Sequence, residues 1–128
     1  MEIRLAAGFR SVADVDKMLA SVGAQSALLG RDAPFVIAAD WRGVGLMAPD
    51  TAARASEMLT QTNPRVLRSA ILVHEAQPTA TLQVHRLVKE AQNENRRMFS
   101  KVSEQAAWLA EVLTPEELAR LYDFLALG

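Results

Sequence analysis

The chain has 128 residues, a formal net charge of −1 and no cysteine, and half of its residues are apolar. That length suits one domain with a single core, and the apolar content excludes a disordered chain. The lack of cysteine excludes disulfides, thiolate zinc sites and a cysteine nucleophile, and the balanced charge gives no reason to expect a nucleic acid partner.

The first residues, "MEIRLAAGF", have no basic region followed by an apolar run, so they do not resemble a signal peptide. No apolar stretch approaches the roughly 18 residues that a membrane-spanning helix needs. We therefore expect a cytoplasmic protein without an integral membrane segment. A chain without cysteine suits that reducing compartment.

The first third of the chain predicts a strand, a helix and a second strand. Residues 2–9 alternate between apolar and polar, which is typical of a half-buried strand. A helix follows Ser11, and it ends either at Gly23 or at Gly30, because the residues between the two glycines are still apolar. Residues 34–41 form a continuous apolar run behind a proline, which predicts a parallel strand buried on both faces.

The middle of the chain continues this alternation. Apolar residues at helical spacing predict helices over 50–61 and over 78–95, the longest in the chain. Residues 66–73 form a second apolar strand, and residues 97–100 form a short one. Each helix therefore connects two strands, as in a parallel sheet.

Two further helices end the chain. Ser103 is the expected N-cap of the first, and Thr114-Pro115 with two following glutamates predicts the start of the second. The order of elements is β-α-β-α-β-α-β-α-α. It predicts a single-domain α/β fold with a mostly parallel four-stranded sheet flanked by helices.

Polar residues follow the predicted strands and define a candidate binding rim. In an open parallel sheet, ligands bind beyond the carboxyl ends of the strands. We expect a partner or ligand rim formed by the residues at these ends and at the start of the next helix: Asp40, Trp41, Arg42, Asp50, Thr51, His74 and Glu75.

The same residues suggest catalysis only weakly. Asp40 and His74 have the chemistry of an acid–base pair, with Thr51 as acceptor or nucleophile. However, any parallel sheet places polar residues at its strand ends, and we expect no enzyme. His74 and His85 are the only histidines and have no evident third ligand, so we expect no metal. The "GVG" at 43–45 has no dinucleotide-binding spacing, and we expect no cofactor.

The charges are distributed unevenly. Residues 64–101 hold seven basic against three acidic residues, and residues 102–128 hold one basic against five acidic. Such asymmetry indicates either a binding face or two solvated surfaces that neutralise each other. The basic side chains of Arg86, Lys89 and Arg96-Arg97 suit a phosphate or anionic-lipid site, or a solvated helix face.

The apolar residues near the C-terminus have two interpretations. Trp108 is expected to pack a helix against the sheet, because a tryptophan buries a large area. The last helix has apolar residues on more than one side, which favours contact with a partner chain or a second copy as well as its own core. The residues expected on this partner or dimer helix are Leu118, Leu121, Tyr122, Phe124 and Leu125.

Three segments carry a resemblance to a known family. They are "VIAADWRGV" with Asp40 at the strand end, "RSAILV", and the ending "RMFSKVSEQAAWL", in which Phe99 precedes Ala106-Ala107-Trp108-Leu109. The chain resembles the STAS-like domains, which are related to the bacterial anti-sigma-factor antagonist. The resemblance covers residues 1–113 as an α/β domain, with residues 114–128 as an added amphipathic helix that packs on the domain or on a partner.

The resemblance implies a non-enzymatic bacterial regulatory or scaffolding module that acts by protein–protein interaction. In the antagonist branch, a serine in an Asp-Ser-Ser-Gly motif is phosphorylated. This chain has Asp50-Thr51-Ala52-Ala53 there, so Ala52 replaces the phosphoacceptor and Thr51 keeps one hydroxyl. The chain also has room for only one strand before the first helix, where the family has a hairpin. The alternative function is a module that binds a small ligand, nucleotide or lipid at the carboxyl ends of the strands.

Overall fold

The centre of the protein is a parallel sheet. The computed structural model describes residues 2–4, 9–30, 33–74 and 76–126. The sheet order is β1-β2-β3-β4, and every neighbouring pair is parallel. Its strands are β1 (Glu2–Arg4), β2 (Phe35–Asp40), β3 (Val66–Leu72) and β4 (Arg96–Phe99). Residues 2–4 of the edge strand β1 pair with residues 38–40 of β2. The predicted α/β class, with a parallel sheet flanked by helices, is confirmed.

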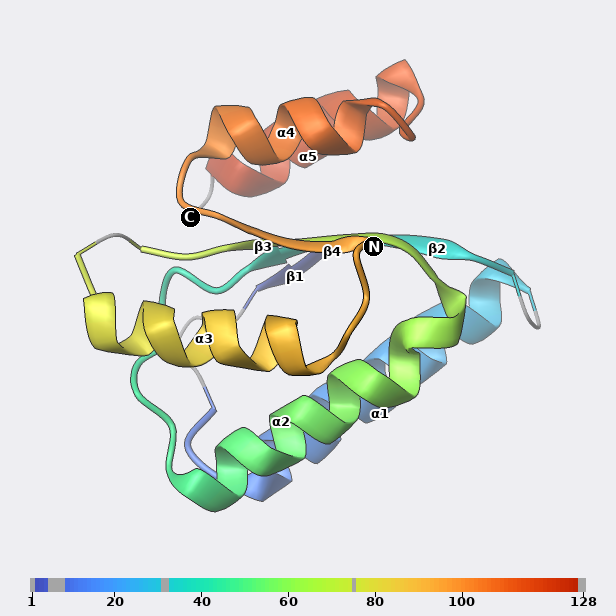
Figure 1. Ribbon diagram of the computed structural model, residues 1–128. Coiled ribbons are helices and arrows are strands. Elements are labelled where there is room, and N and C mark those ends of the chain that lie inside the picture. Colours follow the sequence, from blue (N-terminus) through green and yellow to red (C-terminus); the bar gives the residue numbers. More distant parts are fainter. Residues whose placement is uncertain (1, 5–8, 31–32, 75, 127–128) are drawn as a thin grey trace.

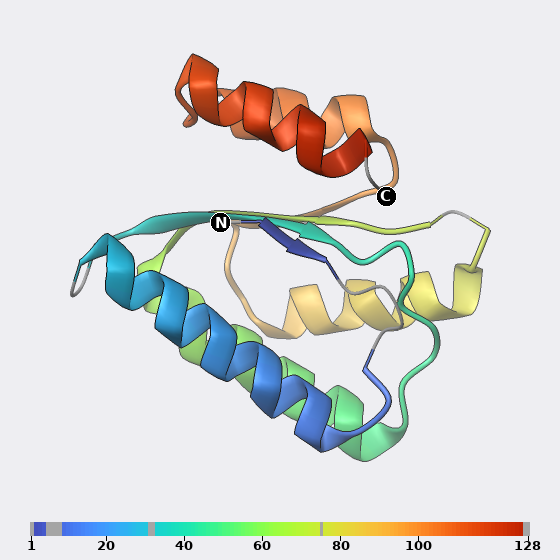
Figure 2. The same cartoon turned by 180° about the vertical axis from the view of Figure 1, so that it is seen from behind.

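Helices cover the two faces of the sheet in different ways (Figures 1 and 2). The connecting helices α1 (Val12–Leu29), α2 (Pro49–Thr62) and α3 (Pro78–Glu90) lie on one face. Right-handed crossovers that always step to the next strand in the same direction place their helices on the same side. The other face is therefore left to the chain after β4, and α4 (Val102–Ala110) and α5 (Pro115–Ala126) cover it.

Each face of the sheet has its own apolar core. Successive side chains of a strand point to opposite faces, and β2 follows this rule. Phe35, Ile37 and Ala39 belong to the core beneath α1, α2 and α3. Val36 and Ala38 contact the core beneath α4 and α5. The predicted burial of this strand on both faces is confirmed.

The structure settles one helix boundary for which the sequence left two alternatives, and it corrects two others. The first helix continues through Gly23 and ends before Gly30, whose φ of 111° is a conformation that glycine adopts without strain. Helix α3 ends at Glu90, earlier than expected, and Gln92 nearby has a positive φ. Ser103 is not an N-cap, because α4 already begins at Val102.

Candidate functional site

The end of β2 carries an ion pair between a buried carboxylate and a partly exposed arginine. Asp40 is 3 % exposed, and Arg42 binds its carboxylate in a bidentate manner, with Nε–Oδ1 at 2.9 Å and Nη2–Oδ2 at 2.8 Å. The hydrogen bond to Asp40 raises the pKa of Arg42. Arg42 Nη2 also donates to the carbonyl of Leu125 at 3.1 Å. These contacts tie the strand end to the last turn of α5, and they give Asp40 and Arg42 a structural role.

Trp41, the next residue along the chain, lies in the other core. It is 2 % exposed and contacts the ring of Phe9 edge-on, with 5.6 Å between the centroids. The two predicted rim residues Asp40 and Trp41 therefore belong to opposite faces of the sheet, as their alternation along an extended chain requires.

The start of α2 is separated from the sheet edge. The loop after β2 runs down to the helical layer, and α2 begins at the far end of that layer (Figure 1). Gln83 of α3 fixes this loop with two hydrogen bonds: its Oε1 accepts the N–H of Met47, and its Nε2 donates to the carbonyl of Met47. Asp50 Oδ1 accepts the N–H of Thr51 at 2.8 Å, and Thr51 is only 1 % exposed. The hydroxyl of Thr51 is therefore inaccessible to a kinase in this conformation.

The other predicted rim residues follow β3. His74 is exposed, and its Nδ1 accepts the N–H of Ala76 at 3.0 Å. Glu75 lies outside the described residues. No interaction between the described residues joins His74 to Asp40 or Thr51, so the acid–base pair that the sequence only weakly suggested is not assembled.

The topology gives a physical reason for the scattered rim. A crevice forms beyond the carboxyl ends of parallel strands where the strand order reverses, because the flanking connections then leave to opposite faces. The order β1-β2-β3-β4 contains no such reversal. The described rim residues therefore have different environments: Asp40 and Trp41 are buried on opposite faces of the sheet, Thr51 is buried in α2, and His74 is exposed after β3.

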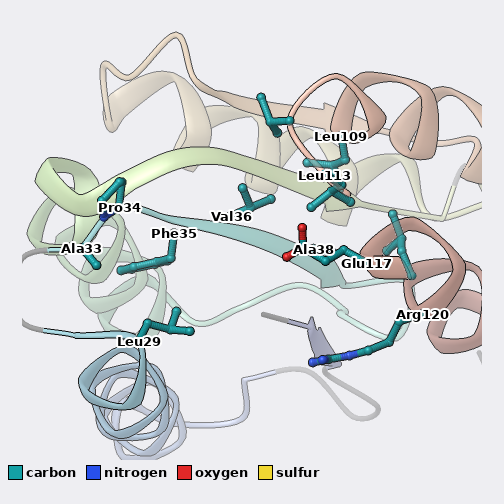
Figure 3. A pocket seen from close by; sticks show the side chains of 12 residues that line it. Leu29, Ala33, Pro34, Phe35, Val36, Ala38, Leu109, Leu113, Glu117 and Arg120 are labelled. Carbon is teal, nitrogen blue, oxygen red and sulfur yellow. The ribbon is translucent and has the colours of Figure 1, made fainter. Parts of the chain in front are cut away.

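A groove lies instead near the opposite, amino ends of the strands. It has a volume of about 360 Å³ and lies between the first residues of β2, the end of α1 and the α4–α5 hairpin (Figure 3). Its apolar walls include Leu29, Val36, Ala38, Leu109 and Leu113. Its volume is in the range of ligand-binding clefts.

Two charged residues of α5 also line the groove. Figure 3 shows the carboxylate of Glu117 extending from α5 over β2. Glu117 Oε1 accepts the N–H of Thr114 at 2.9 Å, and Thr114 Oγ1 accepts the N–H of Glu117 at 3.2 Å. This reciprocal capping box lowers the pKa of Glu117, and the charge of Arg120 lowers it further. Glu117 is therefore anionic at neutral pH.

Sequence reasoning missed this groove because its walls come from both ends of the chain. Leu29 and Val36 lie 84 and 77 residues before Leu113 in the chain. The one local clue is the pair Leu28-Leu29 at the end of α1, which the structure leaves 88 % and 56 % exposed. Two exposed leucines in succession at a helix end have no core-packing role, and Leu29 is part of the apolar lining of the groove.

The predicted partner or dimer helix packs mainly against its own domain. Leu121 and Leu125 are buried, and Leu118 and Phe124 pack against the same core. Tyr122 is 50 % exposed. The apolar residues that the sequence places on more than one side of α5 thus mostly cover the second face of the sheet.

Trp108 is buried, as predicted, and is 8 % exposed. The guanidinium groups of Arg68 and Arg97 lie 4.8 and 5.0 Å from the centre of its ring. Arg68 also donates to the carbonyl of Trp108 at 2.6 Å. Trp108 therefore has a packing role in the core beneath α4 and α5, and the two cation–π contacts add to it.

Arg96 is buried in the core and is not part of a basic surface. It is 4 % exposed, and burial lowers its pKa to about 10, so it is charged at neutral pH. Its Nη2 donates to the carbonyl of Leu59 at 2.9 Å, and its Nε donates to Asn63 Oδ1 at 2.8 Å. Arg96 therefore joins the end of α2 to β4, and an anion site that includes it is excluded in this conformation.

Comparison with known proteins finds no matching family model and no significant match to a curated protein or a solved structure. Within the described residues, no helix is both long and apolar enough to cross a membrane. The same part of the chain holds no group of three or more His, Asp or Glu side chains placed to bind a metal ion.

Proposed function

We propose that the protein is a non-enzymatic interaction module that binds a partner protein at the groove between β2 and the α4–α5 hairpin. The supporting observation is the groove itself, with an apolar wall that includes the exposed Leu29 at the end of α1. Exposed apolar patches with a polar rim are typical of protein-binding surfaces. The STAS-like resemblance supports the same kind of role, a cytoplasmic regulatory or scaffolding module.

The predicted rim residues support this proposal by their structural roles. Asp40 is bound by Arg42, and Thr51 is buried at the start of α2. Residues used in this way are poor candidates for a catalytic site, which needs a nucleophile and a base within hydrogen-bond distance of each other. The groove offers recognition by shape and charge instead.

A pair of surface variants tests the proposal. Leu29→Glu places a charge in the groove wall, and Leu82→Glu, at the 68 % exposed Leu82 of α3, is the matched control. We expect a protein captured from source cells by wild type and by Leu82→Glu to be absent from the Leu29→Glu capture. The purified complex, measured by calorimetry, should bind Leu29→Glu at least ten times more weakly. If every captured protein binds both variants equally, the groove is not the interface.

The volume of the groove also supports the alternative of a small ligand, here at the amino ends of the strands and not at the carboxyl ends. A thermal-shift screen tests it, because a ligand present at 100 times its Kd stabilises the folded state by about 2.7 kcal/mol. A hit that still stabilises Leu29→Glu fully would place the ligand elsewhere.

A second copy of the chain is a further candidate partner, and the oligomeric state in solution tests it.

A further inference from the structure

We propose that the groove accepts a lysine or arginine side chain of the partner protein, whose aliphatic part lies on β2 and whose charged end pairs with Glu117. This inference rests on the proposed function and specifies the chemistry of the partner. It follows from a fixed carboxylate, from apolar walls that suit an aliphatic stem, and from the charge of the surrounding segment.

The carboxylate of Glu117 is held in place by its own helix. The capping box with Thr114 fixes the side chain at the first turn of α5, and the lowered pKa keeps it ionised. Figure 3 shows that this orientation directs the carboxylate over β2 and into the groove. An anion that is already oriented loses less conformational entropy when it binds a cation.

Glu117 forms no ion pair within the described part of the chain. Its Oε1 accepts the N–H of Thr114. Arg120, the basic residue that lines the groove, already has an interaction within the chain. The groove therefore presents the carboxylate of Glu117 to a cation of the partner. The guanidinium of Arg120 is less available to an anion.

The walls next to the carboxylate suit the methylene groups of a long basic side chain. Val36 and Ala38 form the floor, and Leu113 lies opposite them. Lysine and arginine bury their aliphatic stems along apolar surfaces while the charged end reaches a polar partner. A neutral apolar side chain would fill the same space but would leave the carboxylate without a partner.

The surrounding charge and surface favour a basic segment of a protein over a free amine. Residues 102–128 hold five acidic residues against one basic residue; Glu111 pairs with Arg68, but Glu116 is exposed beside Glu117. Such a surface attracts a basic partner and speeds association. The exposed Leu29 extends the apolar lining of the groove to the end of α1, where apolar neighbours of the inserted basic residue have room to bind.

Two blocked peptides test the inference. Both have leucines on either side of one central position, which is lysine in the first peptide and Nε-acetyllysine in the second. Binding is followed by the NMR shifts of groove amides in the full chain. We expect the lysine peptide to bind at least ten times more tightly than the acetylated one, because only the ammonium group can pair with Glu117.

The variant Glu117→Gln isolates the charge, because glutamine also serves at this position of a capping box. We expect Glu117→Gln to bind the two peptides equally and Glu116→Gln to retain the wild-type preference. The inference is overturned if neither peptide shifts the groove amides at millimolar concentration, or if Glu117→Gln keeps the preference. A natural partner that binds Glu117→Gln normally but not Leu29→Glu would leave the proposed function intact and reject this inference alone.

Discussion

Buried polar side chains show how single residues define this structure, and Gln105 is the clearest case. It is fully buried against the sheet, where its Nε2 donates to the carbonyls of Ala39 and Ala70. Its Oε1 is buried and has no hydrogen-bond partner among the described residues. A buried acceptor without a partner costs about 1–3 kcal/mol. We expect Gln105→Leu to match or exceed the wild-type free energy of unfolding, measured in urea.

The control for this substitution is Gln105→Ala, which leaves a cavity beneath α4 and should lower the free energy of unfolding by about 2 kcal/mol. A loss of more than about 1 kcal/mol in Gln105→Leu would contradict the prediction. It would mean that the amide contributes more than its unpaired oxygen costs.

The ion pair of Asp40 and Arg42 leads to a second prediction at the residue scale. Arg42 links a carboxylate at the end of β2 to the carbonyl of Leu125 in α5. We expect Arg42→Ala to lower the free energy of unfolding by about 2 kcal/mol, since buried pairs are costly to break and this arginine is partly exposed. Asp40→Asn and the double variant complete a mutant cycle, and a coupling near zero would argue against a structural role for the pair.

At the scale of elements, α5 shows how a local sequence motif fixes a helix end. Thr114 and Glu117 form the two reciprocal bonds of a capping box, with Pro115 in the first turn. Loss of an N-cap costs about 1 kcal/mol. We expect Thr114→Ala to lower the free energy of unfolding by that amount, and Thr114→Ser to have little effect. An equal loss in both variants would show that the methyl group, and not the hydroxyl, is important.

The capping box also makes stability depend on pH. The pKa of Glu117 in the folded state is lowered from its ordinary value of 4.5, mainly by the backbone N–H of Thr114. A carboxyl group whose pKa is lower in the folded than in the unfolded state stabilises the folded state at pH values above the unfolded-state pKa. This contribution is lost as the pH falls through the folded-state pKa. The stability difference between wild type and Glu117→Gln should therefore be constant at neutral pH and shrink below pH 4.5. A difference that grows in acid would reverse the sign and contradict the assignment.

At the scale of the whole molecule, the sequential sheet order makes the C-terminal hairpin essential. All three connecting helices lie on one face, and the other face depends on α4 and α5 (Figure 1). A chain that ends at residue 113 would expose the sheet-facing apolar surface that Leu121 and Leu125 now cover. We expect this shortened chain to bind a hydrophobic dye and to lose near-UV circular dichroism, as molten states do.

The matched control for the shortened chain is the full chain with Tyr122→Ser, which removes an exposed side chain of α5 and should keep the native spectrum. If residues 1–113 unfold cooperatively with wild-type stability, the division into a complete α/β domain and an added helix is correct. In that case α5 would be free to bind a partner.

The sequence by itself determined the elements and their order. Helical and strand periods are local properties, so the apolar run of β2 and the capping box at Thr114 predict their structures without reference to the rest of the chain. The alternation of strands and helices then predicts a parallel sheet. Trp108 was also predictable as a packing residue, because its size makes burial the dominant effect.

The tertiary structure decided where a partner has room to bind. The strands β2 and β3 are neighbours, but long-range packing pairs Asp40 with Arg42 and buries Thr51 in α2, so these residues and His74 do not form the rim that the sequence predicts. The groove joins Leu29 and Val36 to Glu117, and no periodic pattern connects residues so far apart in the chain. Local periodicity decides which face of an element is apolar, but only the packed fold decides which apolar surface remains uncovered.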